Sequence, residues 1–287
     1  MSETVDAEVL AKLRGFDTPT LCNALEVVLP SRQGHGFTRS PLYCVHPELP
    51  PMVGFARTAH ICASRPSNRD PAAERDVTLA YYRHVAEPPH PTITVIEDID
   101  REPVGAWWGE VHTHVHRGLG SLGVITDGTV RDLDQVAEGF QVLARGVGPS
   151  HAHVHVFDVG SPVTVAGMSV SPGDLIHADR HGALVIPVEV ASQLPDAAER
   201  VMKGERVMIE ASKQPDFGIA KLEQLMNGRD HGRVPGSPGP GKLTPSSPSA
   251  PDRLPRVAGR DAVRTPVRSP GRDRRCPPGC PRRRPRR

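Results

Sequence analysis

The feature that most constrains the fold of this 287-residue chain is a change of composition near Gly228. Residues 229–287 contain 13 Pro and 7 Gly and have almost no aromatic or periodic apolar content. Burial in such a segment cannot offset the conformational entropy that folding removes. We therefore expect one folded domain over residues 1–228 and a disordered Pro/Arg-rich tail over residues 229–287.

The two segments also differ in charge. The tail carries 16 Lys and Arg against 4 Asp and Glu, whereas the body carries 19 basic and 29 acidic residues. A body this acidic repels a polyanion, which argues against nucleic acid as a partner of the core. The tail ends in RRRPRR and offers an electrostatic arm, but it has no aromatic residues for stacking on bases, so we favour an extension without that role.

The expected cellular compartment follows from features that the sequence lacks. No apolar run approaches the length of a membrane span, and the first residues do not show a basic-then-apolar signal pattern. Five Cys is an odd number, and the sequence has no C-x-x-C pair. We expect a soluble cytoplasmic protein with no membrane partner.

Apolar periodicity in the body alternates between helical and strand-like segments, which predicts an α/β fold. A helical period covers residues 5–15, and a second begins at Thr18-Pro19, with Pro at a first-turn position. The remaining expected elements are strands at 53–62, 92–97, 122–126 and 141–145, helices at 72–86, 106–117, from Asp132 and at 189–212, and several short strands within 151–187.

The pair Arg131-Asp132 directly follows a buried strand and the turn Asp127-Gly128. Ligands of α/β sheets bind at the carboxyl ends of strands, where helix N-termini direct free N–H groups at anions. Arg offers a bidentate fork for a carboxylate, and Asp offers a hard oxygen ligand for Mg²⁺. The spacing alone is equally compatible with a surface ion pair.

Glu110, twenty intervening residues and Arg131-Asp132 resemble the D-x20-R-D signature of class II 4-hydroxy-4-methyl-2-oxoglutarate aldolases, which belong to the RraA-like family. Further pieces follow in the family order: TPTLCNAL near the start, GFARTA at 54–59, WGE at 108–110 and PGDLIHADRHGALVIP at 172–187. The resemblance spans roughly residues 16–190 and excludes the tail.

This resemblance implies a three-layer α/β/β fold of the swivelling, phosphohistidine-domain-like type. It also implies a homotrimer or a hexamer built from two trimers, with active sites at subunit interfaces. One of Glu199 and Glu205 would be the acid that a neighbouring subunit contributes, and the sequence does not choose between them.

The activity that the resemblance implies is a divalent-metal-dependent lyase. It would cleave 4-hydroxy-4-methyl-2-oxoglutarate-type 2-oxo acids to pyruvate and would also decarboxylate oxaloacetate. Asp132 would bind the metal, most simply Mg²⁺, with Mn²⁺ as the other candidate. Arg131 would hold the pyruvoyl end, Glu110 would orient a water on the metal, and the backbone amides of Val111 and His112 would receive the substrate carboxylate. Both reactions leave a pyruvate enolate, whose charge a metal and Arg131 stabilise without a Schiff-base lysine.

Two positions depart from the family pattern. Gln135 stands where an acid commonly follows the motif Arg by four residues, and Asp134 comes one place earlier. Glu110 is one methylene longer than the usual Asp. The exact substrate, the preferred metal and the choice between trimer and hexamer are left open by the sequence.

Two other functions compete with the lyase. One is a noncatalytic RraA-like regulator that binds an RNA-degrading enzyme, although an acid paired with Arg-Asp fits the catalytic branch better. The other is a zinc enzyme that uses His151, His153 and His155, which on one strand would share a face. His112 and His116 have helical i,i+4 spacing, but the H-E-x-x-H zinc motif fails because Thr follows the first His.

Overall fold

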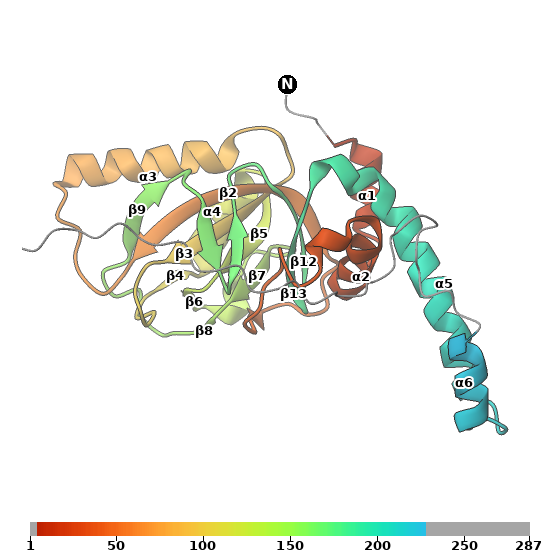
Figure 1. Ribbon diagram of the computed structural model, residues 1–287. Coiled ribbons are helices and arrows are strands. Elements are labelled where there is room, and N and C mark those ends of the chain that lie inside the picture. The colour runs from red at the N-terminus through yellow and green to blue at the C-terminus, as the bar shows by residue number, and fades with distance from the viewer. Residues whose placement is uncertain (1–4, 228–287) are drawn as a thin grey trace, which may run out of the picture. The chain divides into compact units, whose positions relative to one another are not determined.

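The computed structural model describes residues 5–227, and the tail expected over 229–287 lies outside them. The α-helices are α1 (Ala7–Leu13), α2 (Thr18–Val28), α3 (Pro71–Ala86), α4 (Glu110–Gly118), α5 (Leu194–Ser212) and α6 (Ile219–Asn227), shown in Figure 1. Three 3₁₀ turns are η1 (Pro30–Arg32), η2 (Leu133–Gln135) and η3 (Val188–Gln193).

The strands form three sheets. They are β1 (Tyr43–Cys44), β2 (Met52–Cys62), β3 (Thr92–Asp98), β4 (Ala106–Trp108), β5 (Ser121–Thr126), β6 (Thr129–Val130), β7 (Gln141–Ala144), β8 (Gly146–Val147), β9 (His155–Val159), β10 (Val163–Val165), β11 (Met168–Val170), β12 (Leu175–Asp179) and β13 (Gly182–Ile186). The main sheet has the order β1-β7-β5-β3-β2-β12-β13, and β9 pairs with the second half of β2.

The centre of the main sheet is parallel and its margins are antiparallel. Strands β2, β3, β5 and β7 run parallel, whereas β1, β9 and β12 pair with them antiparallel. The β4, β6 and β8 strands form a separate three-stranded parallel sheet. This arrangement brings several carboxyl strand ends together, which is the edge where α/β sheets bind ligands.

The core has three layers because alternate residues of the main sheet face opposite sides. On β2, Phe55 clusters with side chains of α1, α2 and α5, and Ile61 clusters with side chains of α3. On the other face, Ala56 clusters with Val165 and Met168 of the β10–β11 hairpin. The predicted α/β/β arrangement is therefore confirmed. In Figure 1, α3 runs along one end of the main sheet, and α1 and α2 lie at the other.

The main strands and helices begin and end within a residue or two of the predicted positions, with three exceptions. Residues 106–108 form β4 rather than the start of a helix, because their three side chains are all buried. The helix expected from Asp132 is only the 3₁₀ turn η2, since Asp132 itself is left-handed with φ of 54° and the chain leaves the helical conformation at Val136, where ψ is 137°. The last helix starts at Leu194, after the 3₁₀ turn η3.

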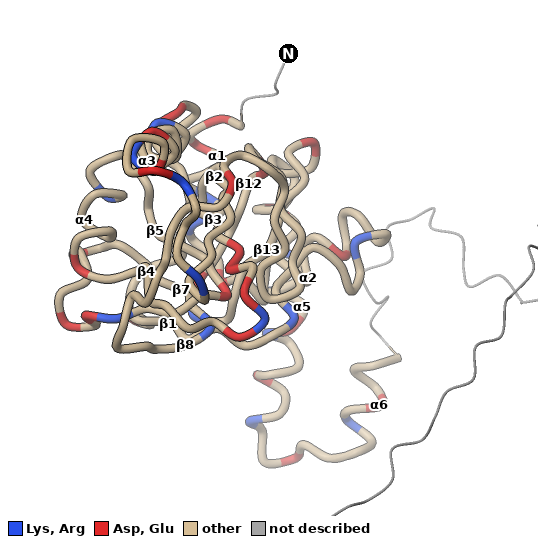
Figure 2. Tube along the Cα trace, turned by 90° about the vertical axis from the view of Figure 1, so that its left-hand side faces the viewer, with Lys and Arg blue, Asp and Glu red and all other residues tan. Residues whose placement is uncertain are grey.

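Two further features of the described chain concern its charge and the apolar length of its helices. Figure 2 shows Lys and Arg interspersed with Asp and Glu along the described backbone rather than gathered in a basic stripe. Among residues 5–227, no helix is both long and apolar enough to cross a membrane.

Candidate active site

The Arg131-Asp132 pair lies at the carboxyl end of the β4–β6–β8 sheet. The Arg131 N–H donates to the carbonyl of Trp108 at 2.8 Å, which continues the β4–β6 pairing. The chain then leaves β4 through Gly109 and enters α4 at Glu110. The sequence motif is thus brought together by two adjacent parallel strands, although twenty residues separate its acid from its Arg.

Asp132 contacts the first turn of α4. Its Oδ2 accepts the Glu110 N–H at 3.3 Å and lies 3.5 Å from the Arg131 Nε. The side chains of Arg131 and Asp132 are 36% and 39% exposed, so solvent reaches the pair. Asp132 therefore partly caps the N-terminus of α4, whose own N-cap residue makes no side-chain hydrogen bond.

Gly109 makes this approach possible. A Cβ at Gly109 would lie 2.4 Å from the Asp132 Oδ2 and 3.1 Å from the Arg131 Cγ. Any side chain here would displace the carboxylate from α4. The glycine of the WGE segment is thus required by close packing, a role that the sequence motif alone does not reveal.

The start of α4 presents unpaired donors. The Thr113 N–H bonds to the Gly109 carbonyl, but within residues 5–227 the N–H groups of Val111 and His112 have no acceptor. Val111 is 69% exposed. Free amides at a helix N-terminus attract anions, and Arg131 adds a full positive charge beside them.

The two acids supply oxygen ligands. Asp132 uses only Oδ2 in its contacts, and the exposed Glu110 carboxylate has no partner among the described residues. Mg²⁺ is held in proteins by one or two carboxylates and several waters, so this donor set fits Mg²⁺. A zinc cage needs more protein ligands, and no group of three or more His, Cys, Asp or Glu in the described chain is arranged to hold a metal.

The histidines proposed for zinc do not share a strand. His151 and His153 lie in the turn before β9, and only His155 is part of it. The His151 ring bonds to the carbonyl of Ala152, and the His155 ring to that of His153. The alternation that suggested a common face belongs to a turn, which is why it does not produce a cluster.

The histidines of α4 are instead bound by aromatic residues. The Trp107 indole N–H donates to the His112 Nδ1 at 2.6 Å, and the Tyr82 hydroxyl lies 3.2 Å from the same atom. The His116 ring contacts the Tyr81 hydroxyl through Nε2 and donates from Nδ1 to the His112 carbonyl. Periodicity contains no signal for the contacts between α3 and α4, because the two helices are distant in the chain.

Burial keeps both rings neutral. It lowers the pKa of His112 to about 4, with the charge of Arg131 as a smaller cause, and lowers the pKa of His116 to about 3. Each ring can then accept a hydrogen bond at one nitrogen and donate at the other. The aromatic contacts join α3 to α4 and hold in place the helix start that carries the free amides.

Gln135 and Asp134 do not enter the pair's contacts. Both side chains are exposed, and the Gln135 N–H bonds to the Asp132 carbonyl in η2. The missing acid of the family pattern therefore leaves the observed Arg131, Asp132 and Glu110 arrangement unchanged.

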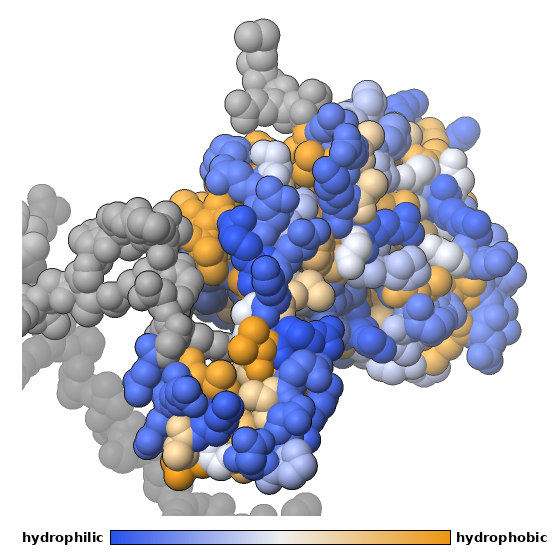
Figure 3. Space-filling model, turned by 90° about the vertical axis from the view of Figure 1, so that its right-hand side faces the viewer, coloured by the Kyte–Doolittle hydropathy of each residue, from blue (hydrophilic) through white to orange (hydrophobic). Residues whose placement is uncertain are grey.

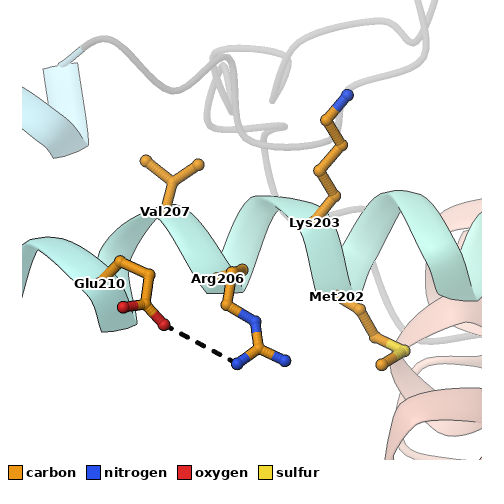
Figure 4. A pocket seen from close by; sticks show the side chains of 5 residues that line it. All are labelled: Met202, Lys203, Arg206, Val207 and Glu210. Carbon is orange, nitrogen blue, oxygen red and sulfur yellow. Dashed lines mark ion pairs between the residues drawn. The ribbon is translucent and has the colours of Figure 1, made fainter.

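A hollow on α5 offers a different surface. Figure 4 shows that Met202, Lys203, Arg206, Val207 and Glu210 line it from a single helix, with Arg206 and Glu210 3.8 Å apart. Figure 3 shows hydrophobic and hydrophilic residues side by side on the face that it presents. Its polar groups do not converge on one point, so the α4 start remains the better candidate for chemistry.

Comparison with known proteins agrees with the motif. The family model described as RraA-like, Aldolase/RraA, matches residues 18–185, more than half of the chain. A putative 4-hydroxy-4-methyl-2-oxoglutarate aldolase of Ectopseudomonas mendocina is 33% identical over 79 residues, which are 24% of this chain and 43% of that protein. An uncharacterised protein of Methanocaldococcus jannaschii is 32% identical over 108 residues, 34% of this chain and 52% of that protein.

The curated relatives are matched only in part, since the similar segments span between 14% and 52% of their lengths. Among solved structures, Streptomyces coelicolor RraAS2, described as an unusual member of the RNase ES inhibitor RraA protein family, has a TM-score of 0.57 at 23% identity. That match covers 72% of this chain and 98% of the other, and at this identity it shows a shared fold.

Proposed function

The chain belongs to the RraA-like family, and on that premise we propose that it is a divalent-metal-dependent lyase that cleaves 4-hydroxy-2-oxo dicarboxylates to pyruvate and decarboxylates oxaloacetate. One observation carries the proposal: Arg131, Asp132 and Glu110 meet at a helix start whose next two amides have no acceptor among residues 5–227. A capping contact alone would need neither the Arg nor the second acid.

The residues present have two roles, which are substrate binding and stabilisation of negative charge. The amides of Val111 and His112 bind the carboxylate of the pyruvoyl end, and Arg131 binds its carbonyl oxygen. Asp132 would hold the divalent metal, and Glu110 would orient water in the site. The metal, when bound, supplies Lewis-acid stabilisation of the negative charge that develops on the substrate.

Both reactions break the bond between C3 and C4 of the 2-oxo acid. In oxaloacetate C4 leaves as CO₂, and in the hydroxylated substrates the C4 hydroxyl loses its proton as C4 becomes a carbonyl. The electron pair of the broken bond enters the pyruvate enolate, whose oxygen Arg131 faces as a preorganised cation. A proton added at C3 then gives pyruvate.

Assembly belongs to the same proposal. Arg131 and Asp132 are more than one-third exposed in a single chain, whereas charge stabilisation of an enolate needs an environment from which water is excluded. We propose that a second copy covers the site in a homotrimer or hexamer and contributes Glu199 or Glu205. Light scattering measures the oligomer, and activity of mixed Asp132→Ala and Glu205→Ala oligomers would report a shared site.

The test is pyruvate release from oxaloacetate and from 4-hydroxy-4-methyl-2-oxoglutarate with Mg²⁺ or Mn²⁺. We expect metal-dependent turnover that EDTA abolishes and that Asp132→Ala lowers at least about 100-fold. Asp134→Ala removes the same charge two residues away and is the matched control, which should keep full activity. Absence of turnover by a correctly assembled wild-type oligomer would refute the lyase and leave the noncatalytic regulator.

A further inference from the structure

The ring of His112 has a fixed orientation at the candidate site. An indole N–H is a donor only, so the Trp107 contact at 2.6 Å makes the His112 Nδ1 an acceptor. The Tyr82 hydroxyl reaches the same nitrogen at 3.2 Å from α3. The proton of the neutral ring must therefore be on Nε2.

The opposite edge of the ring is available for a ligand. The two nitrogens of an imidazole point in nearly opposite directions, so Nε2 faces away from Trp107 and from Tyr82. Within residues 5–227, Nε2 has no hydrogen-bond partner, and it is absent from the buried polar atoms that lack one, so solvent reaches it. His112 thus presents one N–H donor at an accessible position.

This donor belongs to the same residue as one of the free amides. The His112 N–H is unpaired in the first turn of α4, and the charge of Arg131 is close enough to act on the ring. Because Trp107 donates to Nδ1, the ring adds one N–H donor, on Nε2, to the free amide of the same residue. A neutral imidazole in this role distinguishes one ligand from another by the geometry of a hydrogen bond.

We propose that, given the lyase function above, the His112 side chain determines substrate specificity by donating from Nε2 to the distal carboxylate of a dicarboxylic 2-oxo acid. The backbone amides and Arg131 take the pyruvoyl end, which all the candidate substrates share. The His112 ring then takes the part of the substrate that pyruvate lacks. His112 is then the group that distinguishes dicarboxylic from monocarboxylic 2-oxo acids.

The first measurement is the tautomer of His112 by ¹⁵N NMR of histidine-labelled full-length protein. Between pH 6 and 8 we expect a neutral ring with the proton on Nε2. A ring protonated on Nδ1, or on both nitrogens, would overturn the assignment. Trp107→Phe removes the indole donor and should broaden or shift the His112 signals while leaving those of the exposed His114 in place.

The second measurement is binding of two non-cleaved acids, pyruvate and 2-oxoglutarate, in the presence of Mg²⁺. Removing one hydrogen bond to a charged group should weaken 2-oxoglutarate about 10- to 100-fold in His112→Leu, with pyruvate changed less than about twofold. His112→Gln places an amide N–H close to the Nε2 position and should restore most of the affinity. His114→Gln is the control on the exposed face of the same helix.

These outcomes separate the specificity role from the lyase itself. Selective loss of 2-oxoglutarate in His112→Leu supports the role of His112 even if no acid is turned over, in which case the lyase alone fails. Equal weakening of both acids, or no binding of either acid by the wild-type protein, would refute the role of His112.

Discussion

Substitution of Tyr81 tests most directly whether a hydrogen bond joins α3 to α4 as described. Its side chain is fully buried, and its hydroxyl is the contact of the His116 Nε2. His116 is itself fully buried, and its Nδ1 donates to the His112 carbonyl. Tyr81→Phe removes one oxygen and leaves a buried nitrogen without a partner.

The expected loss of unfolding free energy is about 2 kcal/mol. Leaving a buried polar group unsatisfied costs roughly 1–3 kcal/mol, and the removed hydroxyl is too small for a large cavity contribution. In a His116→Leu background the nitrogen is absent, so the same Tyr81→Phe change should cost at least about 1 kcal/mol less. The coupling belongs to the pair and not to Tyr81 alone.

The assay is urea denaturation followed by circular dichroism at pH 7. Tyr43→Phe is the matched control, because Tyr43 is 43% exposed, and it should change stability by less than about 0.5 kcal/mol. A loss below about 0.5 kcal/mol in Tyr81→Phe, or an equal loss in both backgrounds, would refute the hydrogen bond between Tyr81 and His116.

Four further predictions concern the site and the core. Gly109→Ala should lower pyruvate release at least about tenfold, because the added Cβ displaces the Asp132 carboxylate. The free energy of unfolding, measured by thermal denaturation, should change by no more than about 1 kcal/mol. Retained activity would contradict this prediction. Burial raises the pKa of Asp98 to about 6, so its contribution to stability is present below about pH 4 and is lost as pH rises through 6; Asp98→Asn should therefore gain about 1–3 kcal/mol at pH 8 and none at pH 3.5, as measured by urea midpoints. Burial lowers the pKa of His177, so the contribution of the neutral ring to stability is present above pH 6.5 and is lost as pH falls. A His177→Gln variant should therefore lose less stability than the wild type between about pH 7 and 5, and an unchanged pH dependence would disprove this prediction. Asp179→Ala removes the acceptor of the first amide of α2 and should cost about 1 kcal/mol, whereas an unchanged urea midpoint would exclude the capping role.

The sequence alone determined the class of fold and the residues of the motif. Strand and helix periods are local properties of neighbouring side chains, and for this reason β2, α3, β3 and β5 were predicted within one or two residues. Arg131 and Asp132 were identified from a strand end and a family signature. The family model that matches residues 18–185 supports the family, and the roles of the two residues stay a prediction.

Only the tertiary structure decided how those residues meet. The contact between Asp132 and α4 depends on the parallel pairing of β4 with β6 and on the absence of a side chain at Gly109, neither of which has a periodic signal. The helix predicted after Asp132 is only a short turn because the chain becomes extended again at Val136. The state of His112 was likewise decided at a distance, by an aromatic donor on β4 and a hydroxyl on α3. Hydrogen-bond partners and pKa depend on what surrounds a side chain in space, whereas sequence periodicity records only which side chains are buried.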